Sequence, residues 1–305
     1  MKVLVTGATG VAGRATTALL EEAGIETIGL STADGDLRDL SVAVAIFAKA
    51  KPSGVIHLAG RVRGLMGNLR HQGEMFYDNS LINLNVVEAA RQAEVSAFVA
   101  MGTVAMYSDD IERPMREADI WVGRPHGSEL GYANAKRSML GLLEAYSLQY
   151  DFPFSMAFST NLFGPHDRFD EVNGHVMPSL ISKFHRGVSR GESVTVWGSG
   201  TSTRDFLYSR DAAEALLTLL QKGSGVYNLA TGEERSIRQA VDTLCQVADY
   251  RGEVIWDRTK PDGQTARSYD VSLLRQLGWS PRTSFQDAVA ETYEWFERNY
   301  QDARR

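Results

Sequence analysis

The stretch Thr6-Gly7-Ala8-Thr9-Gly10-Val11-Ala12-Gly13 follows a short apolar run at the start of the chain and opens a segment with helical spacing. Its three glycines are three residues apart. Glycine allows a tight turn between a strand and a helix. It also lets backbone N–H groups approach a pyrophosphate at the positive end of the helix. In this position the stretch predicts a dinucleotide site that uses Gly7, Thr9, Gly10, Val11 and Gly13.

Short β-rich runs alternate with helical stretches over the first half of the chain. We predict strands at Lys2–Thr6, Glu26–Leu30, Gly54–Leu58, Phe98–Met101 and Phe154–Phe158. We predict helices at Gly13–Ala23, Ser41–Ala50, Asn79–Ala93 and Tyr132–Tyr150. This alternation is typical of βαβ units, so we expect an α/β fold with a doubly wound parallel sheet of the Rossmann type.

The pattern loosens after Asn161, where glycines and prolines separate short elements. A helix at Ser209–Leu220 and a strand at Gly225–Leu229 are expected to return to the sheet. We therefore predict a nucleotide-binding domain of residues 1–165 and 206–230, and a smaller discontinuous substrate lobe of residues 166–205 and 231–305.

The composition excludes several classes of protein. The net charge is -6 and there is no basic run, which argues against a nucleic-acid partner. No apolar run is long enough to span a membrane. A single cysteine excludes an internal disulfide and fits a reducing compartment. We expect a cytoplasmic protein without a membrane partner or a metal site.

The choice of nicotinamide cofactor depends on the end of the second predicted strand. That strand ends in Gly29-Leu30-Ser31-Thr32, without the acid that often binds a ribose 2′-hydroxyl in NAD sites. Arg14 is placed to meet a 2′-phosphate, although an exposed arginine in a first helical turn explains it equally well. We favour NADP(H). Asp36 and Leu37 are expected near the adenine, and the strand-terminal residues Leu58, Ala59 and Gly60 beside a ribose.

Tyr132 and Lys136 are four residues apart on a predicted helix, so they share one face. A nearby ammonium favours the phenolate, so we expect Lys136 to lower the pKa of Tyr132 and to make it a usable acid or base. Thr103, after a predicted strand, is expected to hydrogen-bond the same substrate oxygen. Asn79, at the start of its predicted helix, is expected to orient Lys136 through a water.

The order of glycine loop, Asn79, Thr103, Tyr132 and Lys136 resembles the short-chain dehydrogenase/reductase superfamily, and the length and second lobe resemble its extended, sugar-nucleotide branch. Within that branch the chain resembles the GDP-L-fucose synthases over nearly its whole length. The segments that carry this likeness are Thr160–Asp167, Gly174–Pro178, Val196–Thr201, Arg204–Tyr208 and Lys260–Gly263.

The resemblance implies NADPH-dependent reduction at C4 of a GDP-4-keto-6-deoxy sugar. It assigns Thr103, Tyr132 and Lys136 to the reduction. It also implies that the nucleotide sugar is held by Asn161, His175, Lys183, Trp197, Arg204 and Arg267. Without the resemblance, a surface salt bridge for Lys183 and a core position for Trp197 would be preferred. Relatives also suggest a homodimer, with the helices Asn79–Ala93 and Tyr132–Tyr150 at its seam. Leu140, Leu143 and Leu148 fit either such a seam or the core of one chain.

The chain departs from the family at one position. GDP-L-fucose synthases use a cysteine and a histidine to epimerise C3 and C5; His175 matches the histidine, but Ala105 stands at the cysteine position. Alanine cannot move a proton, so we expect a C4 reductase whose epimerase activity is lost or reduced, with His175 kept as a catalytic or substrate-binding group. A single inversion by His175 and water stays open. The segment Gly60–Gly67, with two arginines, is expected to line the sugar site.

Four other functions remain as alternatives. A bifunctional 3,5-epimerase/4-reductase would keep the full family reaction. A 4,6-dehydratase is disfavoured because Val104 and Ala105, not an acidic pair, follow Thr103. A C4 epimerase would hold NAD tightly. An NADP-sensing binding protein without catalysis typically lacks the tyrosine–lysine pair that this chain has.

Overall fold

The computed structural model describes residues 1–171, 174–260 and 266–304, with only the backbone of Leu65 and Met66. The likeness at Pro261–Gly263 therefore lies outside the described residues. The first half of the chain contains β1 Lys2–Thr6, α1 Val11–Glu22, β2 Glu26–Leu30, α2 Leu40–Ala50, β3 Gly54–His57, α3 Leu65–Arg70, α4 Gln72–Gln92, β4 Ala97–Thr103, η1 Val104–Met106, η2 Glu117–Asp119, η3 Gly127–Glu129 and α5 Leu130–Tyr150.

The second half continues with β5 Ser155–Ser159, β6 Asn161–Phe163, α6 Val176–Arg190, β7 Val194–Trp197, β8 Thr203–Arg204, β9 Phe206–Tyr208, α7 Ser209–Lys222, β10 Gly225–Leu229, β11 Arg235–Ser236, α8 Ile237–Val247, β12 Val254–Asp257, α9 Ser272–Gln276 and α10 Phe285–Arg298. None of the helices, over the part of the chain that the structure describes, is both long and apolar enough to cross a membrane.

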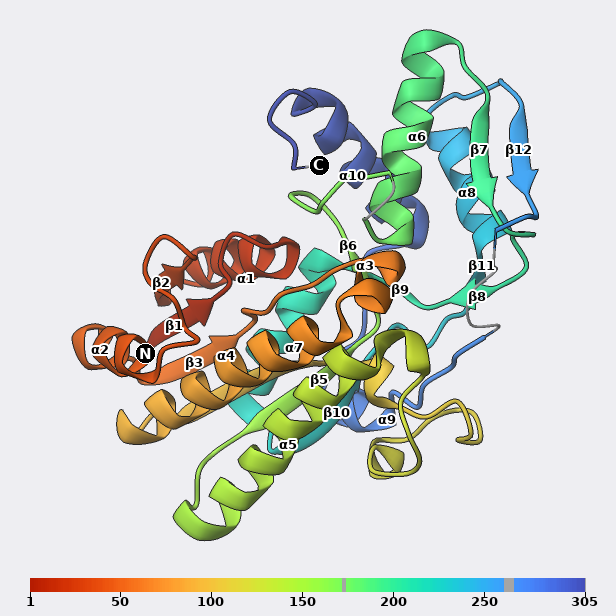
Figure 1. Cartoon of the computed structure of the whole chain (residues 1–305). Helices are drawn as coiled ribbons and strands as arrows, with labels where there is room; N and C mark the ends of the chain where they lie inside the picture. The colour runs from red at the N-terminus through yellow and green to blue at the C-terminus, as the bar shows by residue number, and fades with distance from the viewer. Residues whose placement is uncertain (172–173, 261–265, 305) are drawn as a thin grey trace.

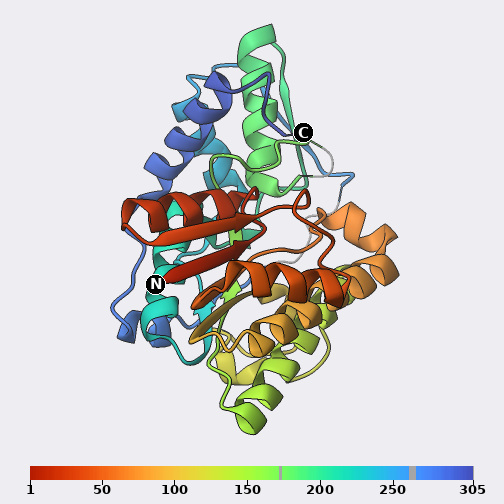
Figure 2. The same ribbon diagram turned by 90° about the vertical axis from the view of Figure 1, so that its left-hand side faces the viewer.

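The main sheet has six parallel strands in the order β2-β1-β3-β4-β5-β10. The inner strands β1, β3 and β5 are mostly apolar and buried on both faces, because helices cover both sides, whereas the edge strand β2 is partly exposed. α1 packs against α7 on one face, and α4 packs against α2 and α5 on the other. Figure 2 shows β1 and β2 between α1 and α2. The expected doubly wound α/β fold is confirmed.

The strand order reverses between β1 and β3, where the chain winds first to one side of the sheet and then to the other. Ligands of open α/β sheets bind outside the carboxyl ends of the strands at such a reversal. The glycine loop follows β1 at this point, and the loop after β3 begins beside it.

A second apolar core lies outside the sheet. It is formed by α6, α8, α10 and the parallel pair β7 and β12, which Figure 1 shows together at one end of the molecule. Phe184, Leu244 and Phe296 are at its centre. The chain then returns to the sheet, since Leu274 and Trp279 pack with buried residues of β1, β3 and α7.

One detail of the expected helices was wrong, and one choice that the sequence left open is decided by the structure. α4 begins at Gln72, so Asn79 lies inside the helix and does not open it. Leu140 and Leu143 are fully buried within the monomer, where they pack in the core under the sheet, so these two cannot line a dimer seam. Leu148 alone of the three leucines is exposed.

Candidate active site

The glycine loop is a turn that no larger residue could form. Gly7 has φ +71°, and a Cβ placed there would lie 2.8 Å from the nitrogen of Ala59. A Cβ at Gly13 would lie 2.1 Å from the carbonyl oxygen of Gly7. Among the described residues, no side chain caps the N-terminus of α1, and its first turn has no acid. The free N–H groups and the helix dipole there suit a pyrophosphate.

An acid that sequence reasoning missed lies at the end of β2. The chain folds back after Ser31, so that the carboxylate of Asp34 accepts hydrogen bonds from the N–H and hydroxyl of Ser31, at 2.8 and 2.9 Å. The expectation that this strand end carries no acid was therefore wrong. Asp34 reaches the end of β2 only because the chain turns after Ser31, and no spacing pattern in the sequence predicts that turn. Arg14 lies exposed in the first turn of α1, directly after Gly13.

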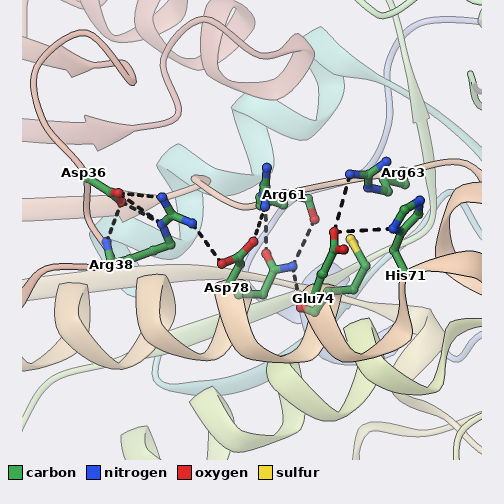
Figure 3. A network of polar contacts seen from close by, with 9 residues as sticks. Asp36, Arg38, Arg61, Arg63, His71, Glu74 and Asp78 are labelled. Atoms are coloured by element: carbon green, nitrogen blue, oxygen red, sulfur yellow. Dashed lines mark hydrogen bonds and ion pairs between the residues drawn. The ribbon is translucent and has the colours of Figure 1, made fainter.

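A chain of ion pairs continues from this loop to α4, as Figure 3 shows. Arg38 binds Asp36 through two of its nitrogens and donates to Asp78 at 3.0 Å. Arg61 donates to the other oxygen of the Asp78 carboxylate. Asp78 is buried, and the two arginines keep its pKa below the usual value despite that burial. Asp36 therefore has its carboxylate engaged by Arg38 in this structure.

Asn79 holds the loop that follows β3. Its side-chain oxygen accepts from the N–H of Arg61 at 2.9 Å, and its side-chain nitrogen donates to the Arg61 carbonyl at 3.1 Å. A Cβ at Gly60 would lie 3.0 Å from the Asn79 oxygen and 3.9 Å from the Lys136 nitrogen. The Asn79 oxygen and the Lys136 nitrogen therefore both lie close to Gly60, on the side where a Cβ would stand.

Lys136 is a buried cation whose ammonium has no acceptor among the residues that the structure describes. Its exposed fraction is 3%. Its nitrogen lies 6.0 Å from the ring centroid of Tyr132. Within the described part of the chain it makes no hydrogen bond or ion pair. Burial lowers the pKa of Lys136 from 10.5 to about 8. An ammonium beside an open glycine loop is suited to bind the hydroxyls of a ribose.

The expected lowering of the Tyr132 pKa was wrong for the protein alone. Burial raises the pKa of Tyr132, and the negative charge of Glu129, one turn earlier, raises it further. Removal of the phenol from water penalises the phenolate, and this outweighs the ammonium 6.0 Å from the ring. Tyr132 is thus held as the neutral phenol, the form that can donate a proton.

Thr103 ends β4 next to the position of the missing cysteine. Its hydroxyl accepts from the N–H of Ala105 at 3.2 Å and caps η1. Ala105 is 5% exposed. Arg267 supports the same turn, since its guanidinium donates to the Val104 carbonyl at 2.9 Å and pairs with Asp109 at 2.6 Å. The structure thus brings Arg267 against the turn that follows Thr103.

Most of the residues expected to hold a nucleotide sugar lie outside the main sheet, on or next to α6, β7 and β8. Trp197 ends β7 and is 41% exposed, so its interpretation as a core aromatic was wrong. The nitrogens of Lys183 and Lys260 lie 5.4 and 5.7 Å from its ring centroid. Lys183 donates to the carbonyl of Thr195 at 3.1 Å, and among the described residues it has no ion pair.

The other expected substrate residues are spread over three elements. His175 occupies the N-cap position of α6, open to solvent on one side, and the surrounding protein lowers its pKa. Asn161 in β6 donates to the carbonyl of Asp205 at 3.2 Å. Arg204 in β8 donates to the carbonyl of Thr203. Burial lowers the pKa of Arg204, and the nearby Glu129 and Tyr269 partly offset this.

Two titratable residues near the candidate site were not predicted from the sequence. Glu129 precedes α5, and its raised pKa is caused first by burial and then moderated by Arg267, His126 and Arg204. His57 ends β3 and is fully buried. A polar residue at the end of an otherwise apolar strand was the available signal for His57; Glu129 had none. No group of three or more potential metal ligands lies together in the described residues.

Comparison with known proteins gives one consistent family. Residues 3–230 match the model of the NAD dependent epimerase/dehydratase family. The GDP-L-fucose synthase of Escherichia coli K12 is 32% identical over 98% of this chain and 97% of its own length. The GDP-L-fucose synthase of Sinorhizobium fredii is 33% identical over 99% and 97%. The crystal structure of a GDP-L-fucose synthetase from Naegleria fowleri bound to NADP has a TM-score of 0.91, with 33% identity, over 99% of this chain and 94% of that chain.

Proposed function

The chain belongs to the NAD dependent epimerase/dehydratase family, and on that premise we propose that it is an NADPH-dependent C4 reductase of a GDP-4-keto-6-deoxy sugar that does not epimerise C3 and C5. The observation that carries the proposal is a reductase pair, Tyr132 and Lys136, beside a buried alanine at position 105. The similar proteins of Escherichia coli and Sinorhizobium fredii are named GDP-L-fucose synthases.

The residues present fit a nicotinamide dinucleotide. Gly7 and Gly13 shape the turn, and the N-terminus of α1 offers free N–H groups. Lys136 offers a buried ammonium that has no acceptor within the described part of the chain. The cofactor supplies the hydride when it is bound. NADP(H) is favoured because the similar Naegleria structure is bound to NADP and because Arg14 is an exposed cation near the glycine loop.

The chain itself supplies the proton and the orientation. Tyr132, kept as the phenol by burial, donates its proton to the C4 oxygen as the carbonyl becomes a hydroxyl. The Thr103 hydroxyl donates a hydrogen bond to the same oxygen. Lys136 holds the ribose and stabilises the phenolate that Tyr132 leaves behind.

The second lobe supplies binding groups for a nucleotide sugar. Trp197 offers an open ring face to a base or sugar, and Arg204 offers a planar fork to a diphosphate. Lys183 adds positive charge beside Trp197. We assign these residues to the nucleotide half of the substrate, with the sugar directed toward Tyr132.

Loss of epimerase activity follows from the chemistry of position 105. Epimerisation removes a proton from one face of the carbon and returns one on the other, so it needs two proton-carrying groups or one that moves. Ala105 has none, and Cys245 is on α8 in the core of the second lobe. Without a cysteine partner, His175 keeps only a role in substrate binding.

The proposal is tested with NADPH deuterated at the transferable position and GDP-4-keto-6-deoxy-mannose. The expected product carries deuterium at C4. Tyr132→Phe should form this product about 10²- to 10⁴-fold more slowly, while Ala105→Cys, the matched variant, should still form it. Loss of NADPH absorbance without a label at C4, or no turnover with this and related GDP-4-keto sugars, would refute the assignment. A Kd for NADPH well below that for NADH is expected in the same preparation.

We also propose that the protein is a cytoplasmic homodimer, formed through α4 and α5. These two helices pack side by side and leave Phe76, Tyr77 and Leu148 exposed; Tyr77 is 65% and Leu148 90% exposed. Light scattering should give twice the mass of one chain, and Tyr77→Asp should reduce it to one. A monomeric wild type would refute the dimer and leave the reductase proposal untouched.

A further inference from the structure

A buried polar chain crosses the sheet at the point where the strand order reverses. Thr6 and His57 are the last residues of β1 and β3, and they are paired in register across the two strands. The Thr6 hydroxyl and His57 Nδ1 are 2.7 Å apart. Both side chains are fully buried. Neither belongs to the expected set of site residues.

The hydrogen bonds around Thr6 determine which partner donates. The Thr6 hydroxyl oxygen accepts from the N–H of Ala59 at 3.1 Å, and it shares the N–H of Leu58, at 3.2 Å, with the Thr6 backbone carbonyl. Its own proton is therefore free for one acceptor, which is His57 Nδ1. Nδ1 then carries no proton, and His57 is the neutral tautomer with its proton on Nε2.

The same logic continues to the catalytic helix. His57 Nε2 donates to the side-chain oxygen of Asn83 at 3.1 Å, and this fixes the orientation of the amide. The Asn83 nitrogen then donates to the carbonyl of Ala135 at 3.4 Å. Ala135 directly precedes Lys136 on α5. The chain thus runs in one direction from the loop after β3 to the helical turn that carries Lys136.

We propose that His57 is a positioning residue that fixes the loop of Leu58 and Ala59 and the α5 turn of Lys136 in one relative arrangement. This inference rests on the proposed reductase function, because it assigns the two fixed groups to cofactor binding. The hydrogen bonds of the His57 ring run to Thr6 and Asn83, so we assign it a role that acts through these neighbours.

The electrostatics of the chain agree with this role. Burial lowers the pKa of His57 to about 3, and the charge of Lys136 contributes to the lowering. His57 therefore remains neutral at physiological pH and keeps one donor and one acceptor. A protonated imidazole would donate from both nitrogens and would break the bond with Thr6.

Three variants separate positioning from simple packing. His57→Phe keeps a buried ring but removes donor and acceptor. His57→Gln keeps one of each. Phe98→Leu is the matched control, because Phe98 is a buried neighbour, 6.3 Å from the His57 ring, with no polar role. His57→Phe should weaken NADPH binding and lower kcat/KM by roughly 10- to 100-fold, because a small misplacement of catalytic groups is costly.

His57→Gln should restore both values to within about threefold of wild type. Phe98→Leu should lower the Tm without changing the NADPH Kd. Equal NADPH Kd and kcat/KM in wild type and His57→Phe would overturn the proposal, and so would equal losses in His57→Phe and Phe98→Leu at matched stability.

A spectroscopic test does not depend on the substrate. In the full-length protein labelled with 15N-histidine, the resonance that disappears in His57→Gln should show a proton on Nε2 and no titration between pH 5 and about 8. A proton on Nδ1, or a titration in that range, would overturn the proposal. If wild type shows this tautomer and binds NADPH but reduces no keto sugar, the proposed function fails and the positioning role stands.

Discussion

Replacement of Lys136 by methionine should make the protein more stable and inactive. The Lys136 ammonium is buried, and within the described residues it has neither a hydrogen bond nor an ion pair, so the fold holds a charge that it does not compensate. Methionine fills a similar volume without a charge. Functional groups in active sites often destabilise the fold, so the removal of one is expected to raise stability.

The magnitude follows from the pKa of Lys136, which burial lowers from 10.5 to about 8. A pKa difference of one corresponds to about 1.4 kcal/mol of free energy. Burial of the Lys136 ammonium therefore lowers the free energy of unfolding by about 3 kcal/mol. Below pH 8 Lys136 is charged in both the folded and the unfolded state, so the folded state bears the full free-energy cost of the buried charge. Between pH 8 and 10.5 the unfolded chain binds more protons than the fold, so this group makes stability rise with pH.

The assay is urea unfolding at pH 7 and at pH 10.5, with Lys49→Met, an exposed lysine of α2, as the control. Lys136→Met should exceed wild type by about 3 kcal/mol at pH 7, and the difference should shrink as the pH rises to 10.5. Lys49→Met should differ little from wild type at either pH. Lys136→Met no more stable than wild type at pH 7 would refute the reasoning that the ammonium is buried without compensation.

Three further changes test other parts of the site. Tyr132→Phe should lower kcat by about 10²- to 10⁴-fold with little change in the NADPH Kd, measured by single-turnover kinetics and fluorescence; a small loss of kcat would remove Tyr132 as proton donor. Gly13→Ala should abolish NADPH binding, because the added methyl would lie 2.1 Å from the Gly7 carbonyl oxygen. Gly73→Ala, where the methyl meets no atom within 4 Å, should bind normally and raise stability by about 0.5–1 kcal/mol in a thermal melt. Trp197→Leu should raise the substrate KM and leave kcat nearly unchanged; a fall in kcat alone would place the ring at the reacting sugar instead.

The main sheet was predictable because its strands are short, apolar and separated by helical spacing. β1 and β10 lie at the expected residues, and β2 does as well. The start of α4 was missed, since Gln72–Asp78 mixes polar and apolar residues without a clear helical face. There the helix is set by contacts: the Gln72 amide bonds the backbone of Gly127, Ser128 and Gly131.

The site was predictable where a motif ties chemistry to spacing. The helical interval between Tyr132 and Lys136 and the glycine loop both belong to that class. The pKa shifts of the site residues were not predictable, because they depend on burial. The Tyr132 pKa is raised in the protein alone, opposite to expectation, and no sequence rule gives the desolvation that causes it. Asp34 reaches the end of β2 through a local turn, and His57 meets Thr6 through a contact between two strands.

The most direct test of the central claim is the reaction of the purified protein with NADPH and GDP-4-keto-6-deoxy-mannose in deuterated water, followed by absorbance at 340 nm and by NMR of the product. The account predicts loss of NADPH with no solvent deuterium at C3 or C5, because Ala105 cannot exchange a proton. Solvent deuterium at either carbon would contradict the loss of epimerase activity and would show that His175 can invert a centre without a cysteine partner.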